Sequence, residues 1–435
     1  MNILLRNIDI ITSDTPVNFI KNGWMGIKDG NIEFVDSTGE KAKTFPADKT
    51  IDGKHRLVLP GLMNTHTHTA MTLLRNYADD MALEEWLFKK IFPAEAKLTD
   101  EDVYWGTLLG IAEMIKSGTT AFADMYLHMD VVAQAVSEAG IRANLSKSPL
   151  TFNVGEKHET IDESQDCIRY FRDWNNKANG KIKVTIEVHS AYLFNENTLK
   201  DAAQLAKGLG AGIQIHILET VREREESIQK YGMNSAEMCL KCGIFDVPVI
   251  AAHCVHLSES DMEILNRKGV SVAHNPTSNL KLGSGIAQIP DLLKKGINVT
   301  LGTDGTASNN NLNMFEEMNL AALIHKGANR DPVLVNAEQA IQMATVNGAK
   351  AMGFGAVSGC IKEGMRADLI LLDTDKLHFT PMNNPLSALV YAAQAGDVDT
   401  VIIDGEIVME NRVLKTIDEE LVKNKVREIS KRILS

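Results

Sequence analysis

The chain has 435 residues, a formal net charge of −12, and 44% hydrophobic residues. This profile is typical of a globular protein with a large core, and it favours one large domain plus a smaller module over several small domains. The acidic balance argues against nucleic acid as a partner, because an acidic surface repels phosphates.

The opening stretch and the cysteines indicate where the protein works. Residues 1–14 alternate in polarity and carry an early charge, so they lack the continuous apolar run of a signal peptide. No apolar run is long enough to predict a membrane span. Five scattered cysteines, an odd number, indicate reduced thiols rather than a disulfide framework. We expect a cytoplasmic protein with no membrane partner.

The first part of the chain has the pattern of short strands broken by turns. Residues 2–11, 23–36 and 49–61 alternate in polarity, and Asp-Gly and Asn-Gly pairs punctuate them. This pattern is typical of strands joined by hairpins. We expect residues 1–58 to form the N-terminal part of a small β-sandwich.

The middle of the chain alternates strand-like and helix-like segments. Helical patterns at 100–118 and 196–210 lie between apolar runs rich in β-branched residues. Eight such runs occur, at 58–66, 119–125, 141–147, 183–190, 212–219, 247–254, 270–276 and 298–304. Repeated βα units predict a parallel sheet, and eight predict an α/β fold closed into a TIM-type (β/α)8 barrel over residues 59–358. An open doubly wound sheet is the competing fold.

The last part of the chain returns to the strand pattern. Residues 367–375 and 398–414 repeat the alternation seen at the beginning. We expect residues 359–435 to supply the C-terminal part of the β-sandwich and a terminal helix. The sequence does not show that the two ends touch.

Polar side chains gather at the ends of the barrel runs. In a (β/α)8 barrel the carboxyl ends of the strands meet at one mouth, where active sites lie. The residues at or just beyond these ends include His66, His68, His189, His216, Glu219, His253, His274 and Asp304. The pattern predicts that they converge on one site.

Metal binding is the first function that these residues suggest. His66 and His68 form an H-x-H on a strand end, and side chains two apart on a strand share a face. His216 is the natural third ligand and Asp304 the fourth. Nitrogen and carboxylate ligands suit one divalent transition ion, zinc by preference and iron as the alternative.

The remaining strand-end residues fit hydrolytic chemistry. A metal with an open coordination position lowers the pKa of water towards ~7, which makes hydroxide available at neutral pH. Glu219 lies three residues beyond His216, so it can face the same cavity. His253 ends the sixth run and can orient or stabilise the nucleophile.

Six ordered motifs resemble those of the amidohydrolase superfamily. They are LPGLMNTHTHTAM, VHSAY, HILET, AHCVH, HNPTSNLKLGSG and LGTDG, which extend from Leu59 to Gly305. EEWLFKKIFPAEAKLT and SNLKLGSG resemble the 5-methylthioadenosine/S-adenosylhomocysteine deaminases within it. No lysine is placed on a barrel run to bridge two metals, which resembles the mononuclear branch.

The resemblance implies an activity. The hydroxide attacks C6 of the adenine in a nucleoside substrate, methylthioadenosine or S-adenosylhomocysteine, with adenosine also open. Ammonia leaves and the adenine becomes hypoxanthine. Glu219 would bind the purine and shuttle protons, Asp304 would take the proton of water, and His253 would hold the developing oxygen charge.

The resemblance also implies substrate-binding residues. Glu95, in FPAE, would accept hydrogen bonds from both ribose hydroxyls, and His189 would contact the substrate. Glu219 and Asp304 would contact it too. Lys147 stands where several relatives carry a substrate-binding arginine, and a lysine lacks the planar fork that binds a carboxylate at two points. Two interpretations of Lys147 therefore stay open: it binds the substrate, or it is an ordinary surface residue.

Two alternatives remain at this point. A deaminase or chlorohydrolase acting on guanine, cytosine or a triazine would keep the metal set without needing Glu95. A non-catalytic scaffold would lose metal ligands, and this chain has every expected one. The sequence also leaves open whether the protein forms a homo-oligomer.

Overall fold

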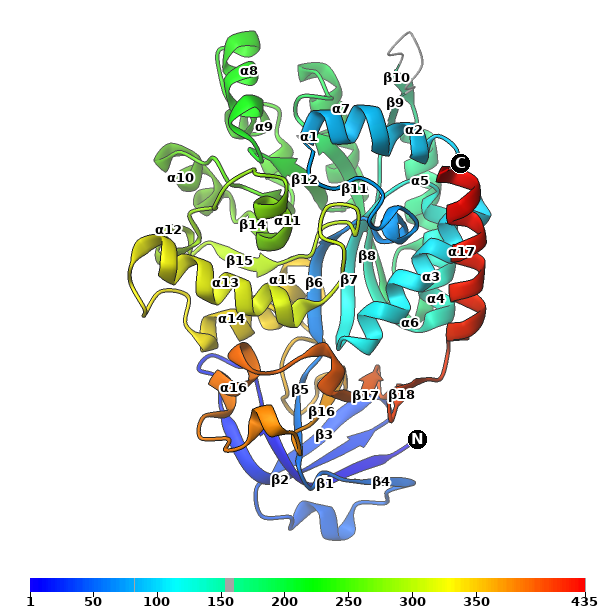
Figure 1. Ribbon diagram of the computed structural model, residues 1–435, viewed down its shortest axis with the longest axis vertical. Helices are drawn as coiled ribbons and strands as arrows, with labels where there is room; N and C mark the ends of the chain where they lie inside the picture. The colour runs from blue at the N-terminus through cyan, green and yellow to red at the C-terminus, as the bar shows by residue number, and fades with distance from the viewer. Residues whose placement is uncertain (82, 153–159, 435) are drawn as a thin grey trace.

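The structure is a computed structural model that describes residues 1–81, 83–152 and 160–434. Two large sheets organise it, an upper one wrapped by helices and a lower one built from both ends of the chain (Figure 1). Within the described residues, no helix is both long and apolar enough to cross a bilayer. The five cysteines are all free.

The upper sheet contains eight strands, in the order predicted for a barrel. Each pairs in parallel with its successor along the chain. The strands are β6 (Leu62–Thr67), β7 (Thr119–Met125), β8 (Arg142–Lys147), β11 (Ile182–Ser190), β12 (Ile213–Ile217), β13 (Val249–His253), β14 (Ser271–His274) and β15 (Asn298–Leu301). A doubly wound sheet reverses its strand order at a switch point. This sheet does not, so the alternative fold is wrong.

The first and last strands of this sheet meet and nearly close it. The Thr65 hydroxyl on β6 donates to the Leu301 carbonyl on β15 at 2.8 Å. Just above, the Asp304 amide donates to the His66 carbonyl at 2.9 Å. The (β/α)8 prediction is thereby confirmed. The closure also places Asp304 directly beside His66.

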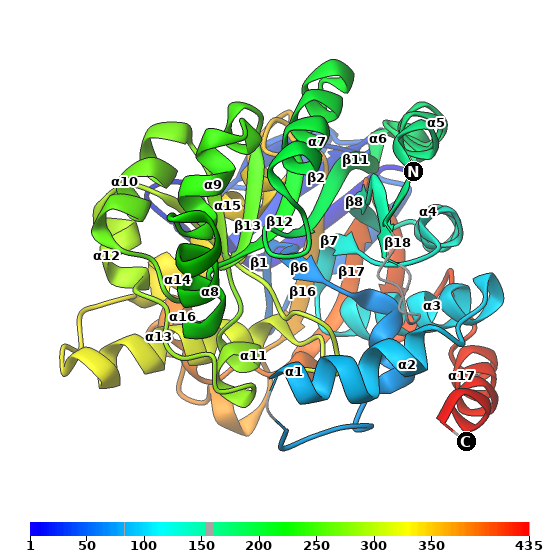
Figure 2. The same ribbon diagram turned by 90° about the horizontal axis from the view of Figure 1, so that it is seen from above.

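Helices surround the barrel, as Figure 2 shows from above. Capping residues fix where many begin: Thr99 accepts from the Asp102 amide before α3, and Asn195 accepts from the Asn197 and Thr198 amides before α7. The helices of six residues or more are α3 (Asp100–Lys116), α4 (Met129–Ala139), α5 (Ser164–Trp174), α7 (Glu196–Leu209), α8 (Val221–Tyr231), α9 (Ser235–Lys241), α10 (Glu259–Lys268), α11 (Pro276–Lys281), α12 (Ile289–Lys294), α13 (Met314–Asn329), α14 (Ala337–Met343), α15 (Val346–Ala351), α16 (Pro385–Tyr391) and α17 (Glu419–Leu434).

The lower sheet joins the two ends of the chain. Its nine strands are β1 (Ile3–Ile11), β2 (Phe19–Lys28), β3 (Asn31–Asp36), β4 (Lys49–Asp52), β5 (Arg56–Pro60), β16 (Leu369–Asp373), β17 (Val398–Ile403), β18 (Glu406–Glu410) and β19 (Val413–Leu414). β5 pairs antiparallel with β16, which brings Leu59 opposite Ile370. The expected β module of both termini is confirmed. Its core includes Ile3, Leu5, Ile27 and Leu369.

The chain passes from one sheet to the other at Gly61. The sequence reads residues 58–66 as one run, but the structure divides it between β5 and β6. A Cβ on Gly61 would lie 2.0 Å from the Thr120 hydroxyl, so only glycine fits there. This close approach bends the chain between sheets, and periodicity alone does not reveal it.

Apolar and charged side chains seal the barrel floor. Met63, Ala121 and Ala273 from the strands pack with Met352 and Phe354 below them. Arg142, buried at the foot of β8, donates to Asp368 at 2.6 Å and to Asp404 at 2.9 Å in the lower sheet. The floor is therefore closed, and only the upper mouth is left for chemistry.

The C-terminal helix α17 lies along α3, on the flank of the barrel rather than on the lower sheet (Figure 1). Val422, Val426, Ile429 and Ile433 form its buried face. Lys116 pairs with Glu419 at 2.7 Å, and Arg432 pairs with Asp102. The predicted terminal helix therefore belongs spatially to the barrel.

One segment between β6 and α3 contributes to the mouth. It contains α1 (Leu83–Trp86), the π-helical turn η3 (Leu87–Ile91) and α2 (Phe92–Glu95). Trp86, Ile91 and Ala94 are buried and hold the segment to the core. It ends with Glu95, which carries that side chain to the barrel mouth.

Candidate metal centre and active site

Four predicted ligands converge at the mouth. The Nε2 atoms of His68 and His216 lie 3.3 Å apart. Asp304 Oδ1 lies 3.3 Å from His68 Nε2 and 3.5 Å from His66 Nε2. Ligand atoms of His66, His68 and His216, and separately of His66, His253 and Asp304, fall within 4.8 Å of one another. These separations match donors around one small cation.

Two of the imidazoles are oriented for metal binding by backbone carbonyls. His68 Nδ1 lies 2.6 Å from the Met125 carbonyl, and His216 Nδ1 lies 2.6 Å from the His189 carbonyl. A carbonyl can only accept, so each Nδ1 carries the proton and each Nε2 keeps its lone pair. His66 Nε2 is buried without a hydrogen-bond partner in the described part of the chain. This donor set fits a divalent transition metal.

The protonation states suit the same use. Burial lowers the pKa of His66 to about 4 and holds that of His216 well below its usual value. For Asp304, burial acts to raise the pKa, but His66, His68 and His253 outweigh it and hold the pKa well below the usual range. Neutral imidazoles and an ionised carboxylate are the forms that bind metal.

His253 and Glu219 lie beside this cluster. His253 Nε2 is 4.0 Å from Glu219 Oε2, and its Nδ1 is 2.8 Å from Asn279 Oδ1. Burial acts to lower the pKa of His253, but Glu219 and Asp304 raise it overall. The Glu219 backbone amide donates to Glu223 Oε2 at 2.9 Å. The Ser284 hydroxyl donates to Glu219 Oε1 at 3.3 Å. A proton donor and an acceptor are thus held next to the metal ligands.

A second group of residues, next to the metal ligands, carries buried polar atoms that lack a protein partner in the described chain. Among the described residues, Glu95 Oε1, Tyr126 Oη, Glu187 Oε2 and His189 Nδ1 are buried and make no hydrogen bond of good geometry, although the Tyr126 hydroxyl lies near the Glu95 carboxylate. Burial raises the pKa of Glu95 to about 7, with Tyr126 and His68 opposing the rise. It also raises that of Glu187 to about 8. Such atoms are costly to bury unless a polar ligand satisfies them.

Lys147 is brought to the mouth but is already engaged. Its ammonium lies 2.6 Å from Asp166 Oδ2 on α5 and 5.8 Å from the centre of the Tyr170 ring. The charge is therefore partly neutralised within the protein.

His274 does not join the site. Ala273 takes the inward position on β14 and packs on the barrel floor. His274 faces α13 instead, where its Nε2 lies 3.2 Å from His325 Nε2. The expectation that His274 faces the mouth is wrong, because successive strand residues point to opposite faces.

Sequence reasoning overlooked three residues that contact this machinery. Ser278 and Ser308 donate to Asp304, and the Tyr126 ring centre lies 6.4 Å from that of His68. All three follow barrel strands. The rule that singled out histidines and carboxylates applies equally to hydroxyls, so extending it would have found them.

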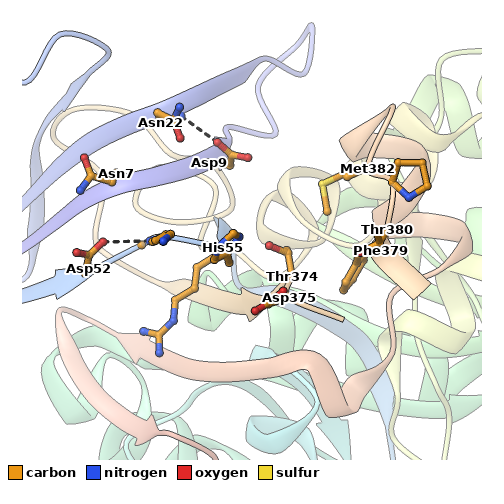
Figure 3. A pocket seen from close by; sticks show the side chains of 14 residues that line it. Asn7, Asp9, Asn22, Asp52, His55, Thr374, Asp375, Phe379, Thr380 and Met382 are labelled. Atoms are coloured by element: carbon orange, nitrogen blue, oxygen red, sulfur yellow. Dashed lines mark hydrogen bonds between the residues drawn. The ribbon is translucent and has the colours of Figure 1, made fainter. Parts of the chain in front are cut away.

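A separate groove of 690 Å³ lies on the lower sheet (Figure 3). Its labelled side chains include Asp9, Asp52, His55 and Phe379, and they come from the terminal module rather than from the barrel mouth. Asp9 accepts from the Asn22 amide at 2.9 Å, so it is engaged within its own module. The groove shares no residue with the convergent ligands.

Comparison with known proteins agrees with this geometry. The model of the Amidohydrolase family matches residues 57–408. A 5-methylthioadenosine/S-adenosylhomocysteine deaminase of Acetivibrio thermocellus is 62% identical over 434 residues, covering 100% of both chains.

Solved structures with the same architecture include two hydrolases. An adenosine deaminase from Xanthomonas campestris with bound zinc has a TM-score of 0.95 and 31% identity, over 99% of this chain and 98% of that one. A triazine hydrolase from Arthrobacter aurescens has a TM-score of 0.91 at 22% identity, over 99% of both chains. At that identity the second likeness concerns the fold alone.

Proposed function

Because this chain belongs to the amidohydrolase family, we propose that it is a metal-dependent aminohydrolase acting on adenine nucleosides. It deaminates 5′-methylthioadenosine, S-adenosylhomocysteine or both, converting adenine to hypoxanthine and releasing ammonia. The observation that carries this is the convergence of His66, His68, His216 and Asp304 within reach of Glu219 and His253. The curated relative with 62% identity bears the corresponding deaminase name.

One divalent transition ion per chain would be held by His66, His68, His216 and Asp304. Zinc is the preferred ion because this donor set suits it and the Xanthomonas structure has zinc bound. The metal would supply the Lewis acidity that lets water act as a nucleophile at neutral pH. Iron remains the alternative ion.

The reaction adds the oxygen of water to C6 and breaks the C6–N bond. Glu219 delivers a proton to N1, so the ring accepts the nucleophile without building a full negative charge. Asp304, whose Oδ1 faces His66 and His68, takes the proton of the attacking water and returns it to the amino group, which leaves as ammonia. The proton of the new C6 hydroxyl restores Glu219 as C6 becomes a carbonyl. His253, whose Nε2 lies 4.0 Å from Glu219 Oε2, would donate a hydrogen bond to the developing oxygen charge.

Glu95 and His189 would hold the nucleoside. An ionised Glu95 can accept from both ribose hydroxyls, which matches its buried and unpartnered Oε1. This feature disfavours a free guanine, cytosine or triazine, none of which offers a diol. Lys147 would contact the 5′ substituent with an ammonium group that already pairs with Asp166 at 2.6 Å.

The same proposal covers the binding partner, the location and the domain boundaries of the protein. The partner is a small-molecule nucleoside, and the free cysteines support a cytoplasmic location. We divide the chain into three parts: residues 1–58 and 359–435, which supply the terminal module, and residues 59–358, which form the barrel.

A substrate panel followed by ultraviolet absorbance tests the proposal, because conversion of adenine to hypoxanthine changes the spectrum. We expect turnover of methylthioadenosine, S-adenosylhomocysteine or adenosine by the zinc-loaded protein. No turnover of these three, together with turnover of guanine, cytosine or a triazine, would transfer the assignment to the alternative.

A further inference from the structure

The two oxygens of the Asp304 carboxylate have different surroundings. Oδ1 faces the Nε2 atoms of His66 and His68 and accepts from the Gly305 amide at 2.7 Å. Oδ2 points the other way and accepts from the Ser278 hydroxyl at 2.6 Å and from the Ser308 hydroxyl at 2.8 Å. The Ser308 hydroxyl also lies 3.0 Å from the Gly305 carbonyl, so its proton is shared between two acceptors with the carboxylate the nearer. One oxygen therefore serves the metal cluster, and the other is occupied by the protein.

The two serines come from different loops of the mouth. Ser278 lies on α11, after β14, and Ser308 lies in the segment after β15. Their exposed fractions are 0% and 2%, so bulk water does not compete for their hydroxyls. Hydrogen bonds to an ionised carboxylate are roughly twice as strong as those between neutral groups. Two of them on one oxygen oppose rotation of the carboxylate about its Cβ–Cγ bond.

A third buried group holds both serine-bearing segments in place. Glu317 on α13 is fully buried and accepts from the Thr277 amide at 3.3 Å and from the Asn309 side chain at 2.7 Å. These are the immediate neighbours of Ser278 and Ser308. Asn309 also donates to the Thr303 carbonyl at 2.8 Å, just before Asp304. The support therefore extends from α13 through both loops to the carboxylate.

We propose that Ser278 and Ser308 are positioning residues that lock the Asp304 carboxylate with Oδ1 towards the metal and the attacking water. The inference rests on the proposed metal site. Without the two hydroxyls the carboxylate can rotate and exchange its oxygens, which would change both the metal geometry and the path of the water proton. Neither serine need touch the substrate.

The test uses Ser278→Ala, Ser308→Ala and the double variant in the full chain. Each single variant keeps one donor, so we expect small losses from either and a larger loss from both. In the double variant kcat should fall about 10–100-fold while KM stays within about threefold, since partners of metal ligands typically contribute on that scale. Chelator competition should show zinc bound about 10-fold more weakly.

Thr306→Val is the matched control. Thr306 lies in the same segment, is fully buried, and its hydroxyl has no hydrogen-bond partner among residues the structure describes. This change removes a buried hydroxyl at nearly constant volume, so the kinetic constants and zinc affinity should remain those of the parent protein. Thermal unfolding of all variants reports any general loss of folding.

Cobalt substitution supplies a readout that does not depend on the reaction. The visible absorption of a Co²⁺-loaded protein follows ligand geometry, so it should change in the double variant and not in Thr306→Val. The proposal is overturned if the double variant keeps the parent spectrum, zinc affinity and kcat. It is equally overturned if Thr306→Val shows the same losses. If the parent protein binds cobalt but deaminates no nucleoside, the proposed function fails while the serine comparison still stands.

Discussion

The two walls of the barrel mouth are built on opposite principles. The metal wall, meaning His66, His68, His216 and Asp304, has three polar atoms that the protein orients: Nδ1 of His68 and of His216 by carbonyls, and Oδ2 of Asp304 by hydroxyls. His66 Nε2 is the exception, since it has no hydrogen-bond partner in the described chain. On the substrate wall, meaning Glu95, Tyr126, Glu187 and His189, each residue buries at least one polar atom without a partner in the described chain. A reaction centre gains from fixed geometry, whereas a binding surface gains by leaving hydrogen bonds for the ligand. Under the proposed function, the difference would separate groups that act on the reacting atoms from groups that recognise the substrate.

Removing the metal should give the largest effect, because every oriented group on the metal wall serves it. Dialysis against a chelator should abolish deamination, and about one equivalent of zinc per chain should restore it. Elemental analysis measures the stoichiometry. Two tightly bound ions per chain would contradict the single-metal assignment.

Glu219→Gln comes next, since it removes a proton shuttle and leaves the metal ligands intact. We expect kcat to fall by ~10²-fold or more, with zinc content preserved. Single-turnover kinetics alongside metal analysis would locate the loss in the chemical step. A near-normal kcat would remove Glu219 from the mechanism.

Glu95→Ala tests the substrate wall. Charge-assisted hydrogen bonds are worth roughly 1.5–3 kcal/mol, so kcat/KM for methylthioadenosine should fall about 10–150-fold. A 2′,3′-dideoxy analogue offers the carboxylate nothing to bind and should be nearly unaffected. Equal losses for both substrates would make Glu95 a structural residue and favour a free-base or triazine substrate.

The pH dependence of binding sharpens the same contrast. The pKa of Glu95 is raised to about 7, so the carboxylate that accepts two hydroxyls is lost as pH falls through that value. Below it, kcat/KM for the nucleoside should decline by up to about tenfold per pH unit. Glu95→Gln should lack this decline, measured in parallel over the range in which zinc remains bound. If the Glu95→Gln variant shows the same decline at low pH as the parent protein, another titrating group causes that decline.

Asp166→Asn should give the smallest change. It frees Lys147 from its 2.6 Å partner without altering either wall. We expect kcat/KM for methylthioadenosine to stay within about twofold, because screened, partly exposed ion pairs contribute little. S-adenosylhomocysteine, which carries a carboxylate, should gain relative to it. If kcat/KM for S-adenosylhomocysteine does not rise relative to that for methylthioadenosine, Lys147 does not belong to the substrate-binding residues.

The sequence predicted that His66, His68, His216 and Asp304 converge because the relevant rule is local. The carboxyl end of a parallel strand is recognisable from a short apolar run, and the barrel gathers all such ends. The rule failed for His274 because neighbouring residues of a strand point to opposite faces, so a shift of one residue moves a side chain from the barrel interior to the outside. Ser278, Ser308 and Tyr126 were missed because the rule was applied to histidines and carboxylates and not to hydroxyls.

Long-range pairing was beyond the sequence for a different reason. The alternation at both ends predicted strands, but nothing local indicates that Leu59 lies opposite Ile370. The placement of α17 on α3 is similar, since an amphipathic helix shows that it has a buried face and not which surface covers it. Such partners are selected by the packing of the whole molecule.

The β5–β16 pairing also sets an order of events during synthesis. The strands before Gly61 are made before the barrel, and β5 can pair with β1 at once, yet it cannot gain its second neighbour, β16, until residues 369–373 have been made. Until then the nascent chain carries an open, apolar strand edge, the kind of surface that invites aggregation. Barrel strands β6 to β15 pair with near neighbours in the chain and can assemble in the interval. The terminal module is thus begun before the barrel and finished after it.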